Sequence, residues 1–97
     1  LDIEPHHPDG NFGMGAIYEA NNKLDKALDF YQKALFRNPD HLSALYNIAR
    51  LQEDYKKDRK AAIIAWKRYV EVANKMGGQG DSLKKAKERL AKLEKLK

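Results

Sequence analysis

The stretch GMGAIYEANNKLDKALDFYQKALFRNP, residues 13–39, contains two segments with helical periodicity and a turn between them. In each segment apolar residues recur at spacings of three and four, which places them on one face of a helix. Asn21-Asn22 separates the segments, and Pro39 ends the second one because proline lacks an N–H and disfavours helical backbone in the preceding residue. A turn this short makes consecutive helices antiparallel neighbours. The stretch therefore predicts a helix pair.

The chain also repeats itself with a period of 34 residues. Similarity at a fixed period is the sequence signature of a repeat protein, so we expect the helix pair to recur. Pairs of identical or similar residues separated by this distance are Pro5 and Pro39, His7 and His41, Met14 and Ile48, Gly15 and Ala49, and Ala27 and Ala61.

Helical spacing continues through the rest of the chain. Apolar stripes in residues 42–55 and 62–73 predict a third and a fourth helix, with the charged segment KKDRK (56–60) as the turn between them. Gly77-Gly78 ends the fourth helix, and residues 81–97 predict a fifth with one stripe of leucine and alanine. No segment alternates polar and apolar residues as a strand would. The predicted fold class is all-α.

The composition excludes several kinds of chemistry. The 97 residues include no cysteine, which excludes disulfides, thiol catalysis and cysteine–zinc sites. No apolar run approaches the roughly 18 residues that a membrane-spanning helix needs. His6-His7 and the distant His41 do not supply the three or four converging ligands of a metal site, and no serine or threonine stands beside a histidine in a catalytic motif. We therefore expect no catalytic residues, no metal site and no cofactor.

No secretory signal is visible, which leaves the compartment open with the cytoplasm as the default expectation.

Residues 8–41 resemble a tetratricopeptide repeat. That family has a pattern of large, small, aromatic and proline positions spread over about 34 residues. The pattern is matched here by Met14, Gly15, Tyr18, Ala27, Tyr31, Ala34 and Pro39. Asn11 departs from it, since a large apolar residue is expected there, and Phe12 is expected to substitute in part. The small residues Gly15 and Ala27 are expected where the two helices approach closely.

Residues 42–76 resemble a second, degenerate repeat with one residue inserted in its turn. Gln52 stands where an aromatic residue is usual, and Leu51 and Tyr55 are expected to supply the missing bulk. The expected architecture is an α-solenoid of antiparallel helix pairs closed by a capping helix, at the C-terminal end of a longer repeat protein. Its expected parts are the tail of a preceding repeat (1–7), a repeat (8–41), the degenerate repeat (42–76), a glycine-rich turn (77–80) and the capping helix (81–97).

The resemblance implies a non-catalytic scaffold that binds another protein or peptide. In this family the first helices of successive repeats line a concave groove that holds a peptide or a helix of the partner. Tyr46 and Arg50 are residue types that tend to dominate interface energies. Some of these domains grip a C-terminal carboxylate with Lys and Asn on the first groove helix, Asn on the second and Lys or Arg on a third. Asn47 fits this set, but Phe12 and Ala16 occupy the two positions on the first helix, so the clamp is expected to be absent. The predicted groove residues are Asp9, Phe12, Ala16, Glu19, Ser43, Tyr46, Asn47, Arg50 and Glu53.

A first alternative is that the last helix binds nucleic acid or an anionic surface. The formal net charge is +5, and residues 80–97 carry seven lysines and arginines against three acidic residues. Against this reading, the lysines are interleaved with Glu88 and Glu94, and no aromatic residue of this helix is available to stack on a base. A capping helix also needs a polar outer face to stay soluble. A nucleic-acid partner is therefore not the expected one.

A second alternative is self-assembly through the edges of the repeats. The surfaces that stack repeats on one another can also stack chains, and an edge without a neighbour exposes apolar side chains. The residues expected at the N-terminal edge are Leu1, Ile3, Phe12 and Met14. Substitutions at Leu1, Ile3 or Met14 are expected to change the oligomeric state without changing partner binding.

Overall fold

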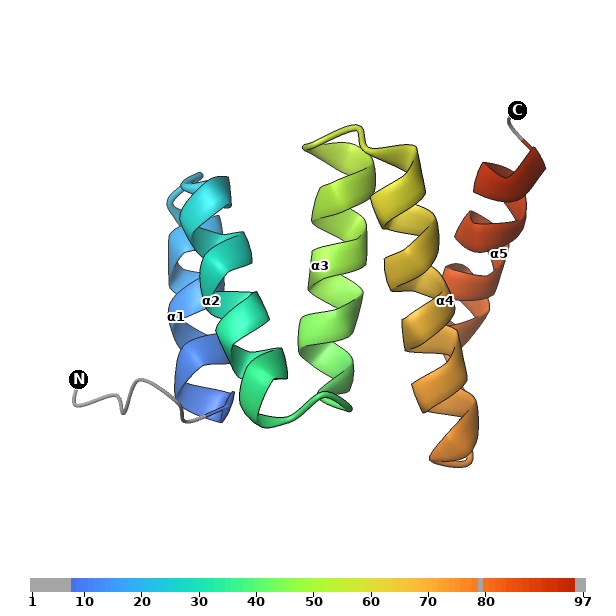
Figure 1. The fold of residues 1–97 in the computed structure, drawn as a ribbon, viewed down its shortest axis with the longest axis horizontal. Coiled ribbons are helices and arrows are strands. Elements are labelled where there is room, and N and C mark those ends of the chain that lie inside the picture. Colours follow the sequence, from blue (N-terminus) through green and yellow to red (C-terminus); the bar gives the residue numbers. More distant parts are fainter. Residues whose placement is uncertain (1–7, 79, 96–97) are drawn as a thin grey trace.

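The computed structural model describes residues 8–78 and 80–95. Regular structure in this part of the chain is entirely helical. The elements are α1 (Pro8–Ala20), α2 (Leu24–Arg37), α3 (Leu42–Asp54), α4 (Arg59–Lys75) and α5 (Asp81–Lys95). Successive helices run in opposite directions and stand side by side from the N-terminal to the C-terminal end of the molecule (Figure 1). This is the all-α helical-repeat fold that the sequence predicts. No helix of the described part is long and apolar enough to span a membrane.

The first helix pair packs closely around Gly15 on α1. A Cβ atom added to Gly15 would lie 2.5 Å from Cε1 of Tyr31 and 3.2 Å from the carbonyl oxygen of Ala27. Both Tyr31 and Ala27 are fully buried on α2. The close approach that the sequence predicts at Gly15 and Ala27 is therefore confirmed.

Polar side chains define where α3 and α4 begin. Nδ1 of His41 accepts a hydrogen bond from the backbone N–H of Ala44 at 3.2 Å, and Oδ1 of Asp58 accepts one from Ala61 at 3.1 Å. Each bond satisfies a backbone donor that the first turn of a helix leaves without a partner. Because Asp58 caps α4, the helix begins at Arg59, three residues before the apolar stripe that predicts it. The turn is correspondingly shorter than the predicted segment 56–60.

Within the described residues, the core consists of two apolar clusters that share α3. The first surrounds Tyr31 between the first pair and α3, and the second surrounds Trp66 between α3, α4 and α5. Leu51 of α3 is buried in the first cluster, as predicted. The prediction that Tyr55 adds bulk to this packing is wrong, because Tyr55 follows the last residue of α3 and is 40% exposed.

The fifth helix packs on the second pair. Leu83, Ala86 and Leu93 of α5 are buried in the cluster around Trp66, and α5 lies against α4 (Figure 1). This stripe is the one that the sequence predicts for a capping helix. The assignment of residues 42–76 as a second tetratricopeptide-like repeat stays a prediction, because helix pairing alone does not test membership of a sequence family.

Candidate interaction groove

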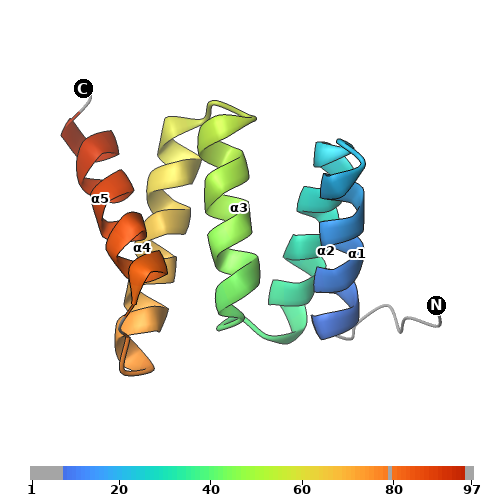
Figure 2. The same ribbon diagram turned by 180° about the vertical axis from the view of Figure 1, so that it is seen from behind.

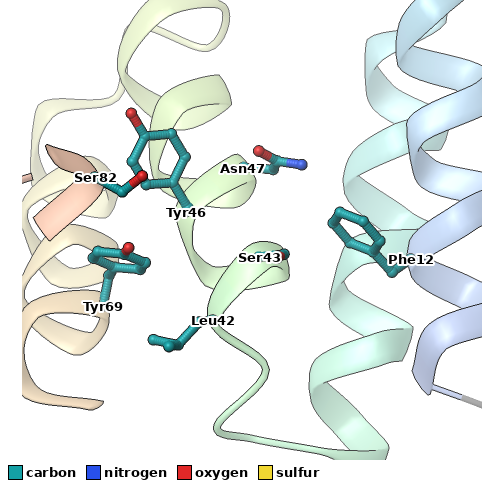
Figure 3. Close-up of a pocket in the computed structure, with 7 residues that line it drawn as sticks. All are labelled: Phe12, Leu42, Ser43, Tyr46, Asn47, Tyr69 and Ser82. Atoms are coloured by element: carbon teal, nitrogen blue, oxygen red, sulfur yellow. The ribbon is translucent and has the colours of Figure 1, made fainter. Parts of the chain in front are cut away.

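A recess on one face of the molecule is bounded by α1, α3, α4 and α5. Phe12 faces Ser43 and Asn47 across the space between α1 and α3, whereas Tyr46 lies near Ser82 at the start of α5 (Figure 3). The recess has a volume of about 240 Å³. Its lining residues are Phe12, Leu42, Ser43, Tyr46, Asn47, Tyr69 and Ser82.

A second recess of about 460 Å³ adjoins the first at Tyr46. It is lined by Tyr46 together with Lys85, Glu88, Arg89 and Lys92 of α5. We call the two recesses together the groove. Among the described residues, every lining residue except Tyr69 comes from α1, α3 or α5. In Figure 2, α1 and α5 lie in front of α2 and α4, so the groove is on the face turned towards the viewer.

Tyr46, at the junction of the two recesses, is held by two other aromatic rings. Its ring makes edge contacts with Trp66, at a centroid distance of 5.0 Å, and with Tyr69 at 5.3 Å. Edge-to-face contacts of this kind are favourable and directional. Trp66 is fully buried, so its position is fixed by the core. The half-buried ring of Tyr46 is therefore presented to the groove in one orientation.

Glu19 joins the first helix pair to α3. Its carboxylate accepts a hydrogen bond from the hydroxyl of Tyr31 at 2.7 Å and forms an ion pair with Arg50. Burial, and then the hydrogen bond and the negative charge of Glu19, raise the pKa of Tyr31 above its usual value. The phenol is therefore neutral and donates at physiological pH. Glu19 and Arg50, both predicted groove residues, are thus engaged with each other between α1 and α3.

Glu53 joins α3 to both later helices. It accepts a hydrogen bond from the indole N–H of Trp66 at 2.9 Å and lies 3.3 Å from Arg89 of α5. Arg89 also approaches Asp54 at 3.6 Å and covers the ring of Trp66. These contacts occupy Glu53, another predicted groove residue, and orient α5 on the second pair.

The structure thus divides the nine predicted groove residues into three groups. Four line the groove: Phe12, Ser43, Tyr46 and Asn47. Three are engaged in polar contacts between helices: Glu19, Arg50 and Glu53. Of the remaining two, Ala16 is exposed on α1 one turn beyond Phe12, and the side chain of Asp9 lies outside the described part of the chain.

Sequence reasoning missed the contribution of α5 to the groove. Lys85, Glu88, Arg89 and Lys92 lie on one face of α5, at spacings of three and four. The order of the helices could have indicated this contribution. Because α5 follows a helix pair, it occupies the position of the first helix of a further repeat, and first helices are the ones expected to line the groove. Lys85 and Lys92 are exposed, and both line the second recess.

The predicted N-terminal edge is only partly described. Leu1 and Ile3 lie outside the described residues. Phe12 packs its ring against Tyr31 at 5.4 Å and His41 at 5.1 Å, and it lines the groove, so it belongs to that face. Met14 is half-buried.

Within residues 8–78 and 80–95 there is no group of three or more His, Asp or Glu side chains that could hold a metal ion.

Comparison with known proteins agrees with the fold and the repeat. Residues 8–41 match the model of the family described as tetratricopeptide repeat. Over 40 residues the chain is 50% identical to the Photosystem I assembly protein Ycf3 of Prochlorococcus marinus. This match covers 41% of the chain and 23% of that protein, so it spans less than a quarter of the relative. No solved structure matches the chain significantly. From the residue pattern, the helix pair packed around Gly15 and the family match, we conclude that residues 8–41 are a tetratricopeptide repeat.

Proposed function

We propose that the protein is a non-catalytic interaction module whose groove binds a segment of a partner protein. The observation that carries the proposal is Tyr46, a half-buried aromatic side chain that lines both recesses and is held by Trp66 and Tyr69. Tetratricopeptide repeats generally mediate protein–protein interactions, and residues 8–41 are such a repeat.

The groove has the properties of a preformed binding surface. A ring already fixed by its neighbours loses little conformational entropy when a partner binds, which favours affinity. Buried aromatic residues near the centre of an interface tend to supply much of the binding energy. The side-chain amide of Asn47 can donate to and accept from a peptide backbone. We propose Phe12 and Ser43 as further contacts, with Asp9 and Ala16 at the edge of the surface.

The partner that we propose is a protein being built into a larger complex. The matched relative is named as an assembly protein. We infer from this name that the groove of the present chain holds a segment of another polypeptide reversibly. An open groove lined by a few aromatic and polar side chains suits such transient binding better than a large apolar interface does.

Selection of peptides from a random dodecapeptide library displayed on phage tests the groove. Peptides selected on the wild-type chain are synthesised, and their affinity is measured by fluorescence polarisation. We expect Tyr46→Ala to weaken binding about tenfold or more, as for a central aromatic contact. Because Tyr46 also packs on Trp66, the variant Asn47→Ala, which leaves the aromatic cluster intact, is measured alongside it.

Ile64→Ala is the matched control, since Ile64 is 69% exposed on α4 and lines neither recess. Circular dichroism establishes that each variant is folded. Peptides that bind the Tyr46 and Asn47 variants as tightly as they bind the wild type would show that the groove is not the binding surface.

A further inference from the structure

We propose that one end of the molecule, away from the groove, binds the surface of an anionic lipid bilayer. This end consists of the α1–α2 turn, the α3–α4 turn and the last turn of α5, and we call it the basic end. The proposal goes beyond the proposed function, because it concerns a second surface and a different class of partner. It follows from the position of the cations, from their lack of ion-pair partners and from the backbone of one lysine.

The antiparallel order of the helices brings the three segments of the basic end together. The α1–α2 turn, the α3–α4 turn and the C-terminal end of α5 lie at the same end of the molecule in both views (Figures 1 and 2). Lys56 in the α3–α4 turn pairs with Asp25 of α2 at 2.8 Å. Glu94 near the end of α5 pairs with Lys67 of α4 at 3.4 Å. Segments that are far apart in the sequence thus contribute to one surface.

Six cations of the basic end have no ion-pair partner. All six are exposed, and none forms an ion pair with another residue of the ranges 8–78 and 80–95. They are Lys23, Lys26, Lys57, Arg59, Lys60 and Lys95. Their charges are therefore available to a partner.

Acidic side chains at the basic end are already engaged within the protein. Asp25 pairs with Lys56, Asp54 with Arg89 and Glu94 with Lys67, and Asp58 caps α4. These pairs cancel one another, so the six cations leave the basic end with a net positive charge.

The opposite end of the molecule lacks this concentration of cations. Its two connections between helices, residues 38–41 and 76–80, contain no lysine or arginine, whereas residues 21–23 and 55–58 of the basic end contain three lysines. Arg68, which pairs with Asp40 and Glu71, is neutralised. Solubility requires charge on the surface but does not require it at one end.

The backbone of Lys57 indicates that its side chain serves something other than the fold. Lys57 has a φ of 56°, in the left-handed region that favours Gly and, after it, Asn. In the α1–α2 turn the residue with such a φ, of 60°, is Asn22. A lysine is less stable in this conformation than either residue, and the exposed ammonium group forms no ion pair that would offset the loss. Strain of this kind is typical of functional positions.

The arrangement of the cations favours a bilayer over a nucleic acid. None of the six lines either recess of the groove, so they face outwards and do not form a channel that follows one phosphate backbone. Tyr55 beside them is 40% exposed, and tyrosine is enriched where a membrane meets water. The ammonium of Lys56 lies over the Tyr55 ring, 5.4 Å from its centroid, where it occupies a face on which a base would stack.

Cosedimentation with phospholipid vesicles tests the proposal. One set of vesicles is pure phosphatidylcholine, and the other contains about one third phosphatidylglycerol, which supplies the negative charge. We expect the chain to bind the anionic vesicles and not the neutral ones. Binding should fall steeply as the salt concentration rises from about 0.05 M to about 0.5 M, because salt screens exposed charges.

Two triple variants locate the binding surface. Lys23→Gln/Lys57→Gln/Lys60→Gln removes three cations from the basic end. Lys75→Gln/Lys84→Gln/Lys87→Gln removes the same charge from exposed positions outside it. We expect the first variant to bind anionic vesicles about tenfold to a hundredfold more weakly than the wild type, and the second to bind within about twofold of it.

Lys57→Asn separates binding from stability. Because Asn suits the left-handed backbone, this variant should melt at the same temperature as the wild type or higher, as measured by circular dichroism. Its binding to anionic vesicles should nevertheless be about twofold to fivefold weaker, since one cation is lost. A lysine with a purely structural role would not give this combination.

Each contrary result overturns the proposal. Equal binding to neutral and anionic vesicles, equal losses in the two triple variants, or unchanged vesicle binding by Lys57→Asn would do so. A fluorescein-labelled single-stranded oligonucleotide is measured in parallel. If it binds through the same lysines and the vesicles do not bind, the basic end is a nucleic-acid site instead. Peptides selected on the groove should bind all of these variants as they bind the wild type, so the vesicle results leave the proposed function unaffected.

Discussion

Gly15 is the residue at which the first helix pair has no space for a side chain. Gly15→Ala would place a methyl group 2.5 Å from a ring carbon of Tyr31, and that ring is buried and hydrogen-bonded to Glu19. Because the ring has nowhere to move, we expect the free energy of unfolding to fall by about 1–3 kcal/mol, as for overpacking of a core. Urea denaturation followed by circular dichroism measures this change.

Gly13→Ala is the matched control for this substitution. Gly13 lies two residues earlier in α1, and a Cβ atom added there would meet nothing within 4 Å. Alanine is the better helix former by up to about 1 kcal/mol, so this variant should be as stable as the wild type or more stable. Equal losses of stability in the two variants would contradict the close approach at Gly15.

Tyr31 gives the protein a predictable dependence on alkaline pH. Burial and the contact with Glu19 raise the pKa of Tyr31 in the folded state, whereas in the unfolded state it ionises near the usual value of about 10. The stabilisation from this residue is therefore complete below about pH 10 and is lost as the pH rises towards the folded pKa. We expect Tyr31→Phe, which removes the hydrogen bond, to cost about 1–2 kcal/mol at pH 8.

The difference in unfolding free energy between the wild type and Tyr31→Phe should shrink between pH 9 and pH 11, since only the wild type loses this contribution. Urea denaturation at both pH values provides the test. All other ionisable groups are common to the two proteins, so the comparison isolates Tyr31. A difference that is constant over this range would show that the pKa of Tyr31 is not raised.

At the level of the elements, Glu53 connects α3, α4 and α5. Glu53→Ala would leave the buried indole N–H of Trp66 without its acceptor and Arg89 without its nearest carboxylate, so we expect a loss of about 1–3 kcal/mol. Glu53→Gln keeps an acceptor for Trp66 and should lose less than about 1 kcal/mol, as for an ion pair that stays partly open to water. Thermal denaturation ranks the variants. Equal losses would show that the acceptor for Trp66 does not matter.

Most elements could be predicted from the sequence because their boundaries have local causes. α1 and α2 show helical periodicity, with the turn Asn21-Asn22 between them and Pro39 after them. The start of α4 was misplaced because Asp58 stands among lysines and an arginine, where a charged run resembles a turn. Its role as a cap depends on one hydrogen bond to Ala61, which composition does not reveal.

The candidate site was less predictable because its composition depends on contacts between distant residues. Glu19 and Arg50 are 31 residues apart, and Glu53 and Arg89 are 36 apart. Sequence spacing places these side chains on the groove face but does not show that they engage each other. Tyr46 and Asn47, which local periodicity puts on the same face of α3, do line the groove.

Across the whole molecule, ion pairs and shared core clusters hold the helix pairs in one arrangement. Lys56 in the turn before α4 pairs with Asp25 of α2 at 2.8 Å, and Arg68 of α4 pairs with Asp40 at 3.0 Å. The hydrogen bond and the charge of Lys56 lower the pKa of Asp25. α5 extends this arrangement, so that one surface runs from Phe12 past Tyr46 to Lys92. On this account the binding surface exists before any partner arrives.

The most direct test of the proposed groove is a titration of the ¹⁵N-labelled chain with a selected peptide, followed through its backbone amide resonances. Our account predicts that the largest shifts fall on Phe12, Tyr46, Asn47, Lys85 and Lys92, on one face of α1, α3 and α5. Shifts concentrated on the exposed positions of α2 and α4, such as Ile64, would contradict it.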